Sequence, residues 1–149
     1  MPSAPRPLPS AETRARVARA AGDLGAAAVQ QMETDHQWYR SLSAEDRSWV
    51  GLVAQAGISS FLDWFGGDQS RPAVTADVFG TAPRELTRSI SLAQTLDLIR
   101  TVIAVVEREI AGLAAPGEGD LAREAVLRYS REVAFSAAEV YAQAAEARG

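Results

Sequence analysis

The segment from Leu92 to Leu113 has a regular apolar spacing that constrains the fold more than any other part of the sequence. Its large aliphatic residues recur at gaps of four and three, which matches the period of an α-helix. If the seven side chains of the main stripe are buried, they contribute roughly 10–20 kcal/mol before entropy is subtracted, at about 1.5–3 kcal/mol each. We therefore expect a central helix, or a seam against a partner helix. The main stripe is Leu92, Leu96, Ile99, Ile103, Val106, Ile110 and Leu113, and Leu98, Val102 and Val105 widen it.

The ends of several helices can be predicted from capping residues. Ser91 precedes Gln94 with the spacing of a capping box and begins the central helix. Ser43 has the same spacing to Asp46, so a second helix is expected to begin there and to end at the glycine pair 66–67. Ser10 can cap a helix over residues 11–35. Two short helices are predicted at 76–79 and 82–88.

The last predicted helix runs from Asp120 to the end of the sequence and is apolar on two faces. Such a helix must be covered twice, by its own core and by a second chain or domain. The pattern leaves open whether a second chain or a further domain supplies that cover, and a homodimer is the arrangement we favour. The first face holds Ala122, Val126, Tyr129, Val133, Ala137, Val140 and Ala144, and the second holds Leu127, Ala134, Ala138 and Tyr141. The candidate dimerisation and transmission face is Tyr129, Val133, Val140 and Tyr141.

No segment of useful length has the period-2 pattern of a strand, so the expected class is all-α. Residues 10–149 are predicted to form one domain, preceded by a disordered proline-rich arm at 1–9. The net charge of −4 gives no overall electrostatic case for nucleic-acid binding, and the absence of cysteine excludes disulfides and thiol catalysis. Without a signal peptide or a membrane-spanning run, the protein is expected to be soluble and cytoplasmic.

The stretch GLVAQAGISSFLDWF, residues 51–65, allows two interpretations. The turn of a TetR-like helix-turn-helix could lie at Gly57, with residues 59–65 as the recognition helix. A recognition helix presents polar and basic groups to DNA, whereas this one would present Asp63 and four large apolar side chains. We therefore favour one continuous helix whose apolar side faces protein, and keep the TetR-like DNA-binding domain as an alternative.

The candidate chemistry of the sequence is sparse. His36 is the only histidine, and Met32 lies one helical turn before it, which would allow His36 to be a haem ligand. We favour the interpretation that His36 lies at a helix end or on the surface. No motif or carboxylate pair indicates catalysis, so we expect no enzyme activity, no metal and no cofactor. The dense aromatic residues are predicted to be core, and the alternative is a pocket or interface, or the cavity of a haem or lipid carrier. The candidate pocket residues are Trp49, Phe61, Trp64 and Phe65.

Four segments carry a resemblance to a known family: WYRSLSAEDRSWVGLVAQAGI, ADVFGTAPREL, LAQTLDLIRTVIAVVE and REAVLRYSREVAFSAAEVYAQAAEARG. They resemble the N-terminal region of actinobacterial PucR-type transcriptional regulators. That region is similar to the RsbRD N-terminal domain of stressosome proteins, which has a globin-like fold without haem. The resemblance implies a globin-like bundle of about five to seven helices.

The same resemblance implies a signal-input and dimerisation domain of a transcription regulator. DNA would be bound by a C-terminal region of a longer protein, outside these 149 residues. A small-molecule effector or a regulatory protein is implied as a further partner, and some regulators of this kind act on fatty-acid biosynthesis genes. No catalytic residue and no cofactor are implied.

Overall fold

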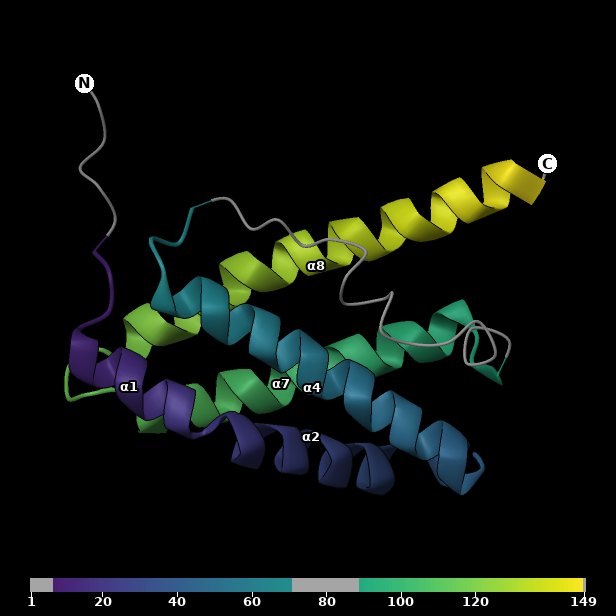
Figure 1. The fold of residues 1–149 in the computed structure, drawn as a ribbon, viewed down its shortest axis with the longest axis horizontal. Helices are drawn as coiled ribbons and strands as arrows, with labels where there is room; N and C mark the ends of the chain where they lie inside the picture. The colour runs from purple at the N-terminus through teal and green to yellow at the C-terminus, as the bar shows by residue number, and fades with distance from the viewer. Residues whose placement is uncertain (1–6, 71–88, 149) are drawn as a thin grey trace.

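A computed structural model of the protein describes residues 7–70 and 89–148, and the described part is a helical bundle (Figure 1). It contains six helices and no strand, which confirms the predicted all-α class there. No helix in this part is both long and apolar enough to cross a membrane. The short helices predicted at 76–79 and 82–88 lie outside the described residues. The helices are α1 (Ala11–Arg19), α2 (Ala21–Asp35), α3 (Gln37–Arg40), α4 (Ala44–Gly66), α7 (Leu92–Leu113) and α8 (Gly119–Arg148).

The predicted helix over residues 11–35 is wrong as a single element, because it breaks at Ala20. This residue has φ −87° and ψ 2°, and it separates α1 from α2. Both α1 and α2 pack against α4 and α7, so the break is set by tertiary packing. Gly25 on α2 fits that packing, because a Cβ atom there would lie 1.8 Å from Oε1 of Gln55 on α4.

Helix α4 is continuous through Gly57, as predicted. The Ser43 side chain caps it by accepting a hydrogen bond from the Asp46 amide at 3.1 Å, and Gly67 is its C-cap. The predicted apolar face is rotated slightly in the structure, because Val53, Gly57 and Trp64 are only partly buried. The buried face is Val50, Ala54, Ile58, Phe61 and Phe65.

Helix α7 is central, since it packs against α1, α2, α4 and α8. The predicted capping box is present: the Gln94 amide donates to Ser91 Oγ at 3.1 Å, and the Ser91 amide donates to Gln94 Oε1 at 2.8 Å. The expected burial of the whole apolar stripe is wrong at its start, where Leu92 is 44% and Leu96 37% exposed.

Two threonines take the place of those leucines on the buried face of α7. The Thr95 hydroxyl donates to the Ser91 carbonyl at 3.0 Å, and Thr101 Oγ1 shares a hydrogen bond with His36. Because these bonds satisfy the hydroxyl groups, the threonines can be buried at low cost. Hydropathy alone could not reveal that this side of α7 faces the core. The buried residues of α7 are Thr95, Leu98, Thr101, Val105, Val106 and Ile110.

The interior consists of two groups of buried residues. The large core cluster joins α1, α2, α4, α7 and α8 and includes Val17, Leu24, Phe61, Phe65 and Ile110. The small core cluster lies nearer the α2–α3 corner and comprises Met32, Tyr39, Val50, Ala54 and Leu98.

A buried hydroxyl ties α1 to the connection between α7 and α8. Thr13 is fully buried, and its Oγ1 accepts a hydrogen bond from the Ala115 amide at 3.0 Å. Nearby, the Ser10 amide donates to Glu118 Oε1 at 2.7 Å, and this bond lowers the pKa of Glu118. Pro9, which falls within the arm expected to be disordered, is also buried.

We expect Thr13→Val to lower the free energy of unfolding by about 1–3 kcal/mol, because valine keeps the volume but leaves the Ala115 amide unpaired. Urea denaturation measures this loss, and hydrogen exchange reports on the Ala115 amide directly. Thr13→Ser is the control, since it keeps the acceptor and should keep that amide protected. Wild-type stability and slow Ala115 exchange in the valine variant would contradict the prediction.

Candidate functional site

Three of the four predicted pocket residues pack together: Phe61 and Phe65 belong to the large core cluster, and the partly buried Trp64 packs against it. The Phe61 ring lies 6.0 Å from Trp64 and 5.6 Å from Phe65, measured between centroids. Tyr129 of α8 completes the group, at 5.4 Å from Phe61 and 5.2 Å from Trp64. Trp49 packs instead against the small core cluster. The structure therefore brings Phe61, Trp64 and Phe65 together as core packing and separates Trp49 from them.

An arginine that the sequence analysis did not single out joins this group. The Arg128 guanidinium lies 5.3 Å from the Trp64 ring centroid, and its Nη2 donates to Gln69 Oε1 at 2.7 Å. Trp64 Nε1 donates to the Ser70 carbonyl at 2.6 Å. These contacts hold the chain after α4 against α8. The cation–π partner is far away in the sequence, so no local pattern could have identified it.

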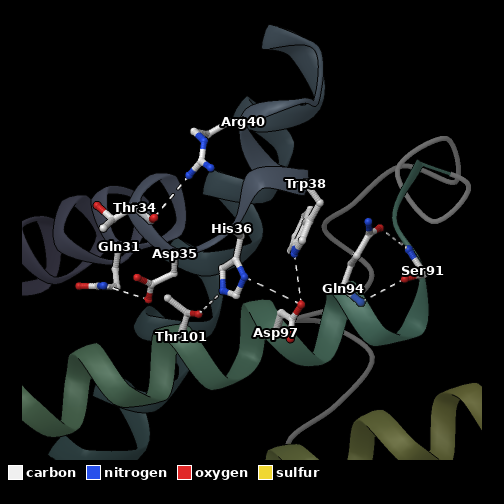
Figure 2. A network of polar contacts seen from close by, with 10 residues as sticks. All are labelled: Gln31, Thr34, Asp35, His36, Trp38, Arg40, Ser91, Gln94, Asp97 and Thr101. Atoms are coloured by element: carbon white, nitrogen blue, oxygen red, sulfur yellow. Dashed lines mark hydrogen bonds and ion pairs between the residues drawn. The ribbon is translucent and has the colours of Figure 1, made fainter.

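A polar network connects the α2–α3 corner to α7 (Figure 2). His36 Nε2 lies 2.9 Å from Thr101 Oγ1, and His36 Nδ1 lies 3.9 Å from Asp97 Oδ2. Trp38 Nε1 donates to the same carboxylate oxygen at 3.2 Å. Asp97 and Thr101 are four residues apart on α7 and therefore share one face.

This geometry places His36 at a helix end, as predicted, but not on the surface. It is the C-cap of α2 and the N-cap of α3, and its side chain is only 19% exposed. Both ring nitrogens lie near α7 side chains, which gives no support to a haem-ligand role. Within residues 7–70 and 89–148 no three potential metal-ligating side chains form a cluster. The network therefore has the features of a structural clamp.

Helix α8 packs into the bundle along its first half, whereas the described side chains of its second half are mostly exposed. Ala122, Ala125, Val126 and Tyr129 are buried in the bundle. From Ala134 onward, every described side chain of α8 except Ser136 is exposed. Figure 1 shows the C-terminal end of this helix, in yellow, extending away from the other helices.

The two predicted faces of α8 differ in burial. The described residues of the second face are exposed: Leu127, Ala134 and Ala138. Leu127 is 51% exposed, and Phe135 beside this face is 66% exposed. We call Leu127, Ala134, Phe135 and Ala138 the outer face of α8.

Of the four residues predicted to form the dimerisation and transmission face, two pack into the chain's own bundle. Tyr129 is 7% exposed, and Val133 packs against the large core cluster, so both face the chain's own bundle. The side chains of Val140 and Tyr141 lie outside the described part. Phe135 was not predicted because it falls outside the spacing that defined the two faces.

The titration of two buried tyrosines, Tyr129 and Tyr39, tests how their rings are packed. Burial raises the pKa of Tyr129, and the Asp63 charge adds to the effect, while a hydrogen bond with Ser60 opposes it. Burial also raises the pKa of Tyr39, helped by the Glu33 charge and opposed by that of Arg47. The stability that depends on these neutral phenols is therefore fully present at pH values below the tyrosine pKa of the unfolded chain, about 10. This stability is lost as the pH rises through the pKa values that the two tyrosines have in the folded protein.

We accordingly expect the phenolate absorbance of the native protein to develop at higher pH than that of the urea-denatured protein. Tyr39→Phe and Tyr129→Phe should each remove part of the late-titrating absorbance. Identical titration of native and denatured chains would show that neither ring is packed as described.

Comparison with known proteins finds similarity but no family match. No family model matches the sequence. The chain is 38% identical over 136 residues to the uncharacterized protein Mb2266 of Mycobacterium bovis, and equally to the uncharacterized proteins MT2302 and Rv2242 of Mycobacterium tuberculosis. Each alignment covers 90% of this chain and 33% of the relative, so the chain spans about a third of the length of these curated relatives.

Proposed function

We propose that the chain is the signal-input and dimerisation domain of a PucR-type transcriptional regulator, with a globin-like bundle that binds a second copy of itself through the outer face of α8. The observation that carries this proposal is the exposure of the outer face of α8, where Leu127 is 51% and Phe135 66% exposed.

The exposed apolar side chains of this helix favour packing against a partner. An isolated helix shorter than about 12–15 residues is marginal in water, because most helix stability in proteins comes from packing an apolar face. The alanines beyond residue 133 favour the helix intrinsically, but Leu127 and Phe135 still leave apolar surface in water. Positions i and i+8 fall on one stripe of a helix, so a single partner helix can cover both side chains. In a twofold dimer the same patch is covered on both copies.

The length of the relatives supports a modular role. They are about three times as long as the region that this chain matches, which leaves room for a DNA-binding region elsewhere in such proteins. We assign DNA binding to that part and not to this domain.

The described helices give no support to DNA binding by the domain itself. A helix-turn-helix at Gly57 would need a turn there, and α4 runs through without interruption. Phe61 and Phe65, which the recognition helix would have to present, are 4% and 1% exposed. We therefore expect no salt-dependent binding of the chain to duplex DNA in fluorescence anisotropy, whereas a DNA reader would bind with an affinity that falls steeply with salt.

A mechanism consistent with this role is a shift between arrangements of the helices. An effector or a regulatory protein that binds one arrangement better would increase its population. Tyr129 of α8 packs directly on Phe61 and Trp64 of α4, so a change in α4 packing would reach α8 through these rings.

The dimer proposal is tested by charging the outer face. We expect the double variant Leu127→Glu, Phe135→Glu to elute as one chain in size-exclusion chromatography with light scattering, at a concentration where the unmodified chain elutes as two. Each buried leucine or phenylalanine contributes about 1.5–3 kcal/mol, and the dimer would lose four of them.

The matched control is Leu52→Glu on α4, which also replaces a half-exposed leucine, 51% exposed, and should leave the dimer intact. Circular dichroism establishes that both variants remain helical. A double variant that still elutes as two chains would rule out the outer face as the interface.

A further inference from the structure

A shallow groove that is wide open to solvent lies between α2, α3 and α4. Its volume is about 400 Å³, within the range of ligand pockets. Polar groups of α2, α3 and α4 line it together with apolar side chains. The lining residues that matter here are Val29, Glu33, Tyr39, Arg47, Ser48 and Gly51.

Tyr39 is the first indication that the groove accepts a ligand. Its side chain belongs to the small core cluster, and the residue is only 3% exposed. The hydroxyl nevertheless has no hydrogen-bond partner among the described residues. The hydroxyl lies at the groove wall, so it offers one donor and one acceptor to a molecule that enters the groove.

Two opposite charges line the same groove without pairing. Glu33 lies on α2 and Arg47 on α4, and neither forms an ion pair with a described side chain. Both act on the Tyr39 phenol, since the Glu33 charge raises its pKa and the Arg47 charge lowers it. A purely anionic ligand would be repelled by the Glu33 carboxylate, and a purely cationic ligand would be repelled by the Arg47 guanidinium.

We propose that this groove binds a small zwitterion with one carboxylate and one ammonium group, of the class of the free α-amino acids. The ligand carboxylate would accept from Arg47 and from the Tyr39 hydroxyl, and its ammonium would donate to Glu33. Ser48 Oγ already donates to the Ala44 carbonyl at 3.0 Å, so it is free to accept from the same ammonium. Val29 offers an apolar contact for an aliphatic side chain. That the ligand acts as an effector rests on the proposed function, whereas its binding does not.

The experiment is a nuclear magnetic resonance titration of the full chain with L-valine, L-leucine, L-glutamate and glycine, followed by the amide signals of residues 29–51. Isobutyrate and isobutylamine serve as ligands that carry only one of the two charges. We expect saturable shifts with at least one amino acid, and binding about tenfold weaker or worse for both single-charge compounds.

The variants Arg47→Gln, Glu33→Gln and Tyr39→Phe should each weaken binding by about tenfold or more, because each removes one hydrogen bond or charge. Arg19→Gln, on exposed α1 surface, is the control and should bind as the unmodified chain does. The proposal is overturned if no amino acid gives saturable shifts, if isobutyrate binds as well as valine, or if the groove variants bind normally.

Sedimentation of the same samples separates this proposal from the dimer. Saturable binding to a chain that is monomeric would support the groove and contradict the proposed function. A dimer that binds none of the amino acids would contradict the groove alone.

Discussion

Replacing Phe65 with alanine is expected to lower the free energy of unfolding by about 3–5 kcal/mol. Phe65 is 1% exposed and packs with Phe61 in the large core cluster, which joins five helices. Removing the ring would leave a cavity that α4 cannot close, because its neighbours are held by α7 and α8 as well. The loss is measured by urea denaturation followed by circular dichroism.

Phe135→Ala is the matched control for that experiment. It makes the same chemical change at a ring that is 66% exposed, so within one chain it should alter the free energy of unfolding by no more than about 0.5 kcal/mol. The comparison is made at a protein concentration low enough for the chain to be monomeric. Equal losses for the two variants would mean that Phe65 is not a core residue.

Placing proline at Gly57 is expected to cost about 3 kcal/mol or more. Gly57 lies in the interior of the 23-residue helix α4, where proline removes one hydrogen bond and its ring clashes with the preceding turn. If α4 ended before this residue and its φ were near −65°, proline would be far less harmful. Thermal or urea denaturation of Gly57→Pro therefore tests the continuity of α4.

Ala44→Pro provides the control in the same helix. Ala44 is the first residue after the N-cap Ser43, whose backbone is extended at φ −60° and ψ 159°. Proline is tolerated at that position because the amide it lacks has no partner within the helix. We expect this variant to retain nearly all of the stability. Similar losses for both prolines would contradict the continuous helix.

The helix ends that the sequence predicts correctly are those fixed by local chemistry. Ser43 and Ser91 cap their helices through bonds to residues three positions away, and Gly67 ends α4. Such interactions depend only on neighbours in the sequence, so their spacing is sufficient to predict them.

What the sequence could not give depends on residues brought together from distant positions. The break at Ala20 and the burial of Thr95 in place of Leu96 follow from how the helices pack. In α8 the pattern predicted two apolar faces, but only the fold distinguishes the face that the bundle covers from the one it leaves exposed.

The same distinction applies to the candidate sites. The aromatic residues were identified from their density, but the separation of Trp49 from Phe61 depends on two different core clusters. Tyr39 was not among the four candidate pocket residues. Only the structure shows that its hydroxyl lines the same groove as Glu33 and Arg47.

Sedimentation equilibrium of the unmodified chain at tens of micromolar tests the central claim most directly. With a chain mass of 15.9 kDa, our account predicts the mass of two chains, because the outer face of α8 is covered by a second copy. The mass of a single chain at that concentration would contradict the dimerisation role assigned to α8.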